Sequence, residues 1–201
     1  MLAALPPRYG ACSTKEQGPL YHSGSLRARV LETFRRMPNG ANAAFYEQEA
    51  LSFPEVAAAS VVPRPRGVGT VDVVIATAAG LPDSELLEAV TDHLEAKREI
   101  AVELQVKAPT ARQMDVTVQV AARAGADSAA VIQAVKSAIQ TWFDGKLLGQ
   151  SVLRAKLGDI IYEVEGVENY AITAPAADVA VDVDELPRLG TLTVTAMEET
   201  T

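Results

Sequence analysis

The stretch Arg64–Ile75, RPRGVGTVDVVI, holds two glycines with the G-x-G spacing of loops that bind phosphate groups. Arg64 and Arg66 stand beside these glycines, Gly67 and Gly69, so positive charge and a flexible backbone occur together. A dinucleotide-binding loop also needs a third glycine and a following helix, because the helix N-terminus meets the pyrophosphate. Here the third glycine is absent and a run of β-forming residues follows. The stretch therefore predicts a turn that leads into a strand, not a phosphate site.

Nucleophilic and metal chemistry have few candidate residues in this chain. Cys12 is the single cysteine, and a nucleophilic thiol needs a neighbouring base that lowers its pKa. His22 lies in the same irregular segment without a fixed relation to Cys12, and His93 lies beside the apolar stripe of a predicted helix. A structural zinc site usually needs four clustered Cys or His ligands, which one cysteine and two histidines cannot supply. We therefore expect no catalytic, cofactor or metal site, and a hydrolase of unrecognised type is the weakest alternative.

The densest group of carboxylates lies at residues 178–185, where charged residues alternate with valines. This alternation is typical of an exposed strand. Clustered oxygen atoms also suit hard cations, so a free-standing binding module for a cation or a basic partner remains an alternative function. The candidate partner-contact residues are three of these carboxylates and five arginines from earlier in the chain: Asp182, Asp184, Glu185, Arg27, Arg35, Arg36, Arg64 and Arg66.

The overall charge separates this chain from general nucleic-acid binders. It has 18 Lys and Arg residues against 26 Asp and Glu residues, a net charge of −8, whereas phosphate binding needs a basic face. Hydrophobic residues make up 48% and charged residues 22%, as in ordinary soluble globular proteins. No window reaches the roughly 18 apolar residues of a membrane span. A single cysteine allows no internal disulfide and fits a reducing compartment, so we expect a cytoplasmic protein.

The elements that would position these residues divide into two units after an irregular leader at residues 1–24. The first unit, residues 25–109, is predicted to hold two helices, a hairpin, a third helix and a strand. The hairpin strands are 56–62 and 70–77, joined by a Pro- and Gly-rich turn. Asn42 and Asp83 are suited to capping the second and third helices.

The second unit, residues 110–201, opens with the clearest strand of the chain, in which valines alternate with polar residues over 114–120. Two helices follow, with Asp127 and Ser151 as predicted N-caps, and a hairpin-like end spans 167–173 and 190–197. Both units run helix, strand, proline, loop, Gly-Thr, strand. The sequence thus predicts an α+β fold of two small, repeat-like units, each an antiparallel hairpin packed on amphipathic helices.

Three stretches resemble the baseplate J-like family, the structural proteins of contractile phage tails and related injection machines. Ser25–Leu51 is similar to the family's arginine-rich helix and the Tyr-bearing helix after it. Phe53–Ile75 is similar to its passage of strand, proline, G-x-G-T-V and strand. Gly166–Thr195, which includes DELPRLGTLTV, is similar to its C-terminal end. The resemblance covers about residues 25–197 and rests on the order of the three stretches.

The resemblance implies a baseplate wedge component that performs no catalysis and carries no cofactor. It implies assembly in the host cytoplasm and a place in the tail baseplate. The implied partners are other wedge and tail proteins in an oligomeric ring, with no nucleic acid. Family members normally have a large region before the arginine-rich helix, where this chain has residues 1–24. We therefore expect an N-terminally shortened copy.

Overall fold

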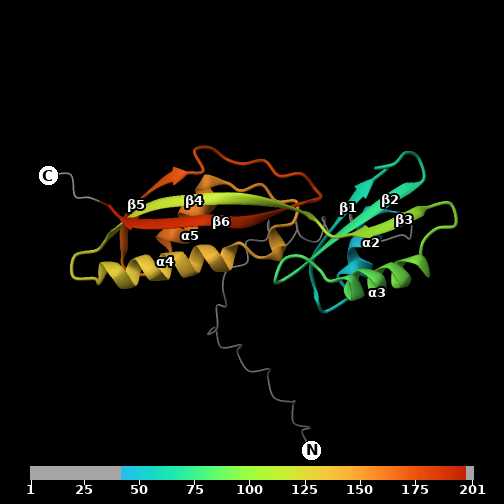
Figure 1. Cartoon of the computed structure of the whole chain (residues 1–201), viewed down its shortest axis with the longest axis horizontal. Coiled ribbons are helices and arrows are strands. Elements are labelled where there is room, and N and C mark those ends of the chain that lie inside the picture. Colours follow the sequence, from blue (N-terminus) through green and yellow to red (C-terminus); the bar gives the residue numbers. More distant parts are fainter. Residues whose placement is uncertain (1–41, 198–201) are drawn as a thin grey trace, which may run out of the picture. The chain divides into compact units, whose positions relative to one another are not determined.

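The computed structural model describes residues 42–197, which fold into four α-helices, one short 3₁₀ helix and two three-stranded sheets (Figure 1). The predicted arginine-rich helix lies outside the described residues, together with Arg27, Arg35 and Arg36. The helices are α2 (Ala43–Ala50), α3 (Ser84–Glu95), α4 (Ser128–Trp142), α5 (Arg154–Tyr162) and the 3₁₀ helix η1 (Gly145–Leu147). The strands are β1 (Val56–Pro63), β2 (Thr70–Thr77), β3 (Glu103–Lys107), β4 (Thr110–Ala122), β5 (Val167–Ala174) and β6 (Glu185–Ala196).

The first sheet has the order β1-β2-β3, with α2 and α3 on one face. β1 and β2 form the predicted antiparallel hairpin, and β3 pairs parallel with β2 after the α3 crossover. Val73 and Ile75 of β2 are fully buried and pack with Tyr46, Val90 and Leu94 from the two helices. Because side chains alternate along a strand, the residues between them point to the opposite face of the sheet.

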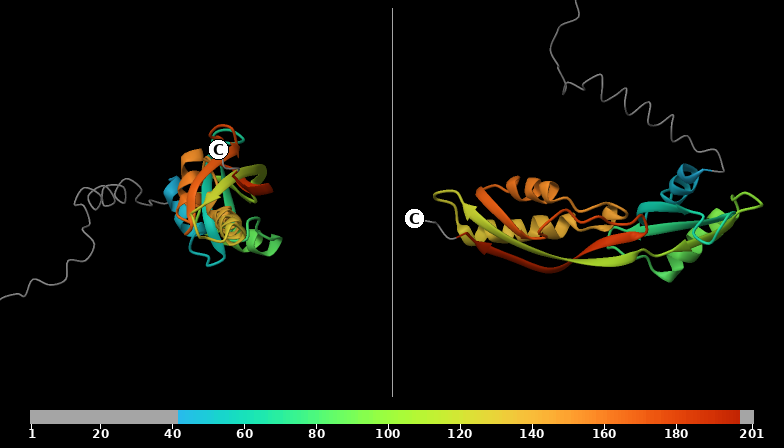
Figure 2. Two further views of the ribbon diagram at one scale, coloured as in Figure 1. Left: turned by 90° about the vertical axis from the view of Figure 1, so that its left-hand side faces the viewer. Right: turned by 90° about the horizontal axis from the view of Figure 1, so that it is seen from above.

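The second sheet is built around β4, with the order β5-β4-β6 and with α4 and α5 packed against it. The buried side chains Val116, Val118 and Val120 of β4 pack with Val135 and Ile139 of α4. Figure 2 shows β4 and β6 side by side along their lengths, in agreement with their parallel pairing. Each sheet therefore combines one antiparallel and one parallel strand pair, and the predicted α+β fold class is confirmed.

The pairing at the C-terminal end differs from the predicted hairpin. β5 and β6 do not pair with each other, because β5 runs antiparallel along one edge of β4 and β6 runs parallel along the other. The physical reason lies in β4, a strand of 13 residues whose apolar side chains are buried. The main-chain groups on both of its edges need hydrogen-bond partners, and each flanking strand supplies one set.

The acidic stretch at 178–185 does not form the predicted exposed strand. Its valines make a single bridge, in which Val179 and Val152 exchange main-chain hydrogen bonds of 2.9 Å. The last strand begins at Glu185 and not at Gly190, since the parallel register with β4 already starts at the pair Thr110–Glu185. The connection between β5 and β6 therefore contains no strand of its own, although the alternation of charge and valine suggested one.

Three of the four predicted helix caps are confirmed. Asn42 accepts a hydrogen bond from the Phe45 amide at 3.0 Å, and Asp83 and Asp127 cap α3 and α4 in the same way. Ser151 does not cap α5, which begins at Arg154 without a local side-chain cap. Asp178 takes this role instead, since its carboxylate accepts from the Arg154 amide at 2.8 Å.

The 3₁₀ helix η1 packs closely on the end of β2. A Cβ atom placed on Gly145 would lie 1.7 Å from the carbonyl oxygen of Thr77, so only glycine fits there without a shift of the backbone. The buried Leu147 and Leu148 of the same turn join a core that holds Val74 and Ala76 of β2 together with the valines of β4. One continuous apolar core thus includes residues from both sheets.

We expect Gly145→Ala to destabilise the fold by about 2 kcal/mol or more, because the added methyl group overlaps a main-chain oxygen that cannot move alone. Urea unfolding followed by circular dichroism measures the change. Lys146→Ala in the same turn is the matched control, because this lysine is exposed, and its unfolding midpoint should stay near that of the wild type. Equal midpoints for Gly145→Ala and the wild type would contradict the close packing.

Candidate functional site: a charged network and an apolar tip on the first sheet

A buried carboxylate, Asp72, marks the face of the first sheet that α2 and α3 do not cover. Its neighbours Val73 and Val71 turn toward the helices, so Asp72 points to the other face. The residue is only 3% exposed although it carries a charge. A buried charge of this kind is tolerated where opposite charges and hydrogen bonds surround it.

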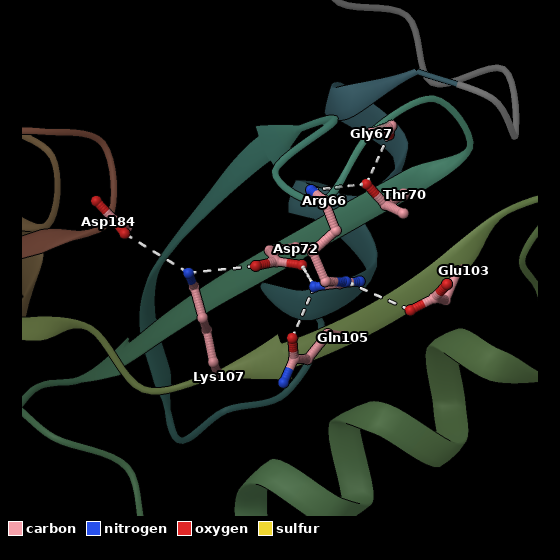
Figure 3. Close-up of polar contacts among 8 residues, drawn as sticks. All are labelled: Arg66, Gly67, Thr70, Asp72, Glu103, Gln105, Lys107 and Asp184. Atoms are coloured by element: carbon pink, nitrogen blue, oxygen red, sulfur yellow. Dashed lines mark hydrogen bonds and ion pairs between the residues drawn. The ribbon is translucent and has the colours of Figure 1, made fainter.

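Two cations from different segments meet at Asp72 (Figure 3). The guanidinium of Arg66, in the turn before β2, forms a close ion pair with one carboxylate oxygen. The Lys107 ammonium at the end of β3 lies 3.2 Å from the other oxygen and 3.5 Å from Asp184. Lys107 thus connects the first sheet to the segment that enters β6.

The Arg66 guanidinium is held from the β3 side as well. It donates to the side-chain oxygen of Gln105 at 2.7 Å and lies 3.3 Å from the Glu103 carboxylate. Together with the Asp72 ion pair, these contacts surround the Arg66 guanidinium on several sides. Arg66, predicted as a partner contact, therefore has an internal role in joining the turn to β2 and β3.

The turn between β1 and β2 is shaped by its glycines and by Thr70. Gly67 and Gly69 have φ values of 118° and 88°, which side-chain-bearing residues rarely adopt. The Thr70 hydroxyl accepts from the Arg66 amide at 3.1 Å and donates to the Gly67 carbonyl at 2.8 Å. The glycines thus serve backbone geometry, as expected for a turn that leads into a strand.

This geometry leaves two large apolar side chains in solvent at one end of the first sheet. Val68 lies at the tip of the β1–β2 turn and is 94% exposed, and Ile100 in the α3–β3 loop is 100% exposed. The two loops are neighbours, because the Glu103 amide donates to the Gly69 carbonyl at 2.7 Å. The exposed Arg64 stands in the same turn with a positive φ of 58°. We call Arg64, Val68 and Ile100 the apolar tip.

Sequence reasoning selected Arg64 at this tip but missed Val68 and Ile100. Their signal in the sequence is an aliphatic residue enclosed by turn-forming or charged neighbours, G-V-G and R-E-I-A. Such a residue does not belong to the apolar face of a helix or strand, so no packed face buries it. Large aliphatic side chains left in solvent on adjoining loops are candidates for contact with a partner.

The carboxylates of the acidic stretch are distributed among separate partners. Asp178 caps α5, Asp184 pairs with Lys107, and Glu185 pairs with Arg112 at 2.9 Å. The bond from Arg112 and the bond from the Asp182 amide together hold the pKa of Glu185 below its usual range. Among residues 42–197 no group of three or more metal-ligating side chains occurs. Asp182 is the exposed carboxylate of the three predicted contacts.

A second polar cluster joins α2 to α3. The Glu49 carboxylate lies 2.6 Å from the Lys97 ammonium and 2.8 Å from Nε2 of His93. The His93 ring also packs edge-to-face on Phe53. Hydrogen bonds from Lys97 and then from His93 lower the pKa of Glu49 below the ordinary value of 4.5. His93, predicted as a boundary residue, lies at this helix junction.

Comparison with known protein families matches each half of the chain to a different domain family. Residues 38–108 match the Baseplate J-like central domain, and residues 114–195 match the Baseplate J-like protein C-terminal domain. The chain belongs to the baseplate J-like family. The central-domain match contains the first sheet with α2 and α3, and the C-terminal match contains α4, α5, β5 and most of β4 and β6. Asp72, Arg66 and the apolar tip all lie in the baseplate J-like central domain.

Two further proteins are similar to this chain, one in sequence and one in fold. An uncharacterized protein of Bacillus subtilis (strain 168), YqbT, is 26% identical over 182 residues, which cover 85% of this chain and 52% of that protein. A chain of the anti-feeding prophage baseplate has a similar fold, with a TM-score of 0.58 at 10% identity, covering 85% of this chain and 42% of that one. The baseplate J-like chain thus spans about half the length of these relatives. Within its described residues, no helix has the length and apolar character needed to cross a bilayer.

We expect Lys107→Met to destabilise the protein by about 1–3 kcal/mol, since it removes one of two cations from a buried carboxylate while keeping the apolar stem. Urea unfolding monitored by circular dichroism measures the loss. Lys156→Met is the matched control, because its pair with Asp159 is exposed and its loss should leave the unfolding midpoint close to that of the wild type. Similar losses for both variants would show that Lys107 does not stabilise Asp72.

Glu49 gives a pH-dependent prediction. The pKa of Glu49 is lower in the folded than in the unfolded state, so the charged carboxylate stabilises the fold. This contribution to the free energy of unfolding is complete above the ordinary glutamate pKa and is lost as pH falls through the folded pKa. We expect Glu49→Gln to cost about 0.5–1 kcal/mol near neutral pH, and we expect this cost to shrink as pH falls below the ordinary glutamate pKa and through the lowered folded value. Unfolding curves of both proteins at several pH values test this. A difference that is constant with pH would contradict the ionic origin.

Proposed function

We propose that this chain is a structural component of a contractile phage-tail or tail-like baseplate and that it acts through assembly contacts, not through catalysis. The observation that carries the proposal is the pair of domain matches, central then C-terminal, which together include both sheets. The fold it shares with a baseplate chain of the anti-feeding prophage supports the same role. Assembly in the host cytoplasm and a final place in the tail baseplate are part of this proposal.

The chemistry of the charged network fits a structural role. Its cations and carboxylates neutralise one another, with Asp72 between Arg66 and Lys107. A general base or a nucleophile needs a free functional group beside a substrate site, whereas these groups hold segments of the fold together. We propose that the described residues divide into two α+β units with the boundary between residues 109 and 110, and that the network stabilises the first unit.

The apolar tip is the proposed contact with a neighbouring wedge or tail protein. Val68 lies in the β1–β2 turn, which the Arg66 contacts and the Thr70 hydrogen bonds hold in place, and the bond from the Glu103 amide to Gly69 joins this turn to the end of the Ile100 loop. A main chain that is already ordered loses less entropy on binding, which favours association. Arg64, Arg66 and Asp182 are exposed charges that can pair with such partners. Asp184 and Glu185 are half-buried; their pairs with Lys107 and Arg112 would position them for the same contact.

The kind of assembly we propose is an oligomeric ring of wedge and tail proteins held together by such contacts. The related prophage baseplate was described with six-fold symmetry, and a heterologous contact between tip and neighbour closes into a ring when the rotation fits. The partners would be products of neighbouring tail genes. Co-expression with those proteins and co-purification of a complex test the function itself, and a chain that ignores every tail partner would contradict it.

We expect the double variant Val68→Ser with Ile100→Ser to weaken binding to the neighbouring tail protein at least about tenfold, because interface energy concentrates in a few apolar anchors. Pull-down and titration calorimetry with the co-purifying partner measure the change. Leu81→Ser with Leu153→Ser is the matched control, since both leucines are exposed but lie outside the tip. Equal binding by the tip variant and the wild type would remove the tip from the interface while leaving the domain assignment intact.

A further inference from the structure

The turn that follows β2 is bound by an arginine from the other domain. Thr77 and Gly80 exchange main-chain hydrogen bonds of 2.9 Å, which close the turn. The Ala79 carbonyl between them accepts a hydrogen bond of 2.7 Å from the Arg188 guanidinium of β6. The turn lies in the central domain and Arg188 in the C-terminal domain, so this bond crosses the junction between the two domains.

Gly80 provides the space in which the Arg188 guanidinium lies. A Cβ atom on Gly80 would lie 1.7 Å from Nη1 and 2.7 Å from Cζ of Arg188, so the head group packs directly on the main chain of the turn. Gly80 also has a φ of 119°, a conformation that favours glycine. Because a guanidinium is planar and carries its donors in a rigid fork, a contact of this kind defines a direction as well as a distance.

A second polar contact crosses the junction four residues earlier in the chain. The Asp184 carboxylate lies 3.5 Å from the Lys107 ammonium at the end of β3 (Figure 3). Extended chain rises by about 3.3 Å per residue, so Asp184 and Arg188 hold the central domain at points about 13 Å apart. Two contacts at this separation oppose a rotation that either contact alone would permit.

The 3₁₀ helix η1 adds a third contact from a separate segment. The Gly145 amide donates to the Ala78 carbonyl of the same turn at 3.5 Å. Leu147 and Leu148 of η1 join the core that contains Val74 of β2. The end of β2 is thus contacted by η1 and by β6, which both belong to the C-terminal domain.

The covalent connection and the shared core do not by themselves choose one angle between the domains. Only residues 108–109 separate β3 from β4, and domains joined by a single connection are expected to move relative to each other unless their interface prevents it. Apolar contacts hold surfaces together but are non-directional. Hydrogen bonds depend on angle, so the polar contacts are the ones that can select an orientation.

We propose that Arg188, Ala79 and Gly80 form an interdomain clasp that fixes the angle between the central and C-terminal domains, so that the two domains move as one rigid body. Arg188 is a positioning residue in this clasp, and Gly80 is the residue that admits it. The clasp also fixes the place of the apolar tip relative to the C-terminal domain. The proposal concerns this chain alone and does not depend on the baseplate role.

Pulsed electron spin resonance on the full chain measures the distance between spin labels on the two domains. The labels are attached through Glu88→Cys on α3 and Gln133→Cys on α4, both exposed positions, after Cys12→Ser removes the single native cysteine. We expect one narrow distance distribution for this protein. Arg188→Met keeps the apolar stem but removes the donors, so it should broaden the distribution or add a second distance.

Arg123→Met is the matched control, because Arg123 donates to the Val167 carbonyl at 3.2 Å within the C-terminal domain, and its loss should leave the distribution narrow. Gly80→Ala tests the clasp without changing the arginine. The added methyl group should displace the guanidinium and broaden the distribution, but it should add no further broadening in the Arg188→Met protein, since coupled residues are not additive.

Circular dichroism shows whether each variant is folded. A broad distribution before any clasp residue is changed would overturn the proposal, and so would a narrow one in Arg188→Met. Equal broadening by Arg123→Met would also overturn it, as would additive broadening by Gly80→Ala and Arg188→Met.

Discussion

The Asp72 carboxylate cannot remain unpaired inside the protein, and the arrangement of the first sheet follows from this constraint. Arg66 must fold back from the turn, and Lys107 must end β3 beside β2, for the charge to be neutralised. Both requirements agree with the parallel register of β2 and β3, which places Lys107 near Val74. Asp72 shares its face of β2 with Val74 and Ala76, which are buried in the core that includes η1 and β4, whereas α2 and α3 cover the other face. The charged network therefore occupies one end of a face whose other end is apolar and buried.

Much of the fold could be predicted from the sequence because its signals are local. The alternation at 114–120 predicts the central part of β4, and the spacing of Leu86, Val90 and Leu94 predicts the face of α3 that meets the sheet. Asp127 caps α4 through a contact only two residues away. Periodicity and capping involve neighbours in sequence, so one chain is enough to recognise them.

What the sequence could not predict depends on residues far apart in the chain. The choice of β4 and not β5 as the partner of β6 depends on both edges of a buried strand. The alternation of charge and valine at 178–185 resembles a strand, yet its carboxylates are held by Arg154, Lys107 and Arg112 from three different segments. In the site, Arg66 was recognisable as a candidate, but its pairing with Asp72 requires the turn to fold back. Val68 has a local signal, a valine between two glycines, but the sequence alone does not show whether a turn residue is exposed or is covered by a distant segment.

β6 contains one residue more than β4 does along the same length, and this has a consequence for how relatives are compared. The register passes from Met114–Leu189 to Val116–Leu192, and the carboxylate of Asp115 accepts from the Thr191 amide at 2.6 Å where the extra residue sits. On each side of this bulge, every second residue of β6 points to the same face of the sheet. The extra residue shifts this alternation by one position. A relative that lacks the extra residue would therefore need a gap near Gly190 in an alignment with this chain, because without the gap core positions would be matched to surface positions along one part of the strand.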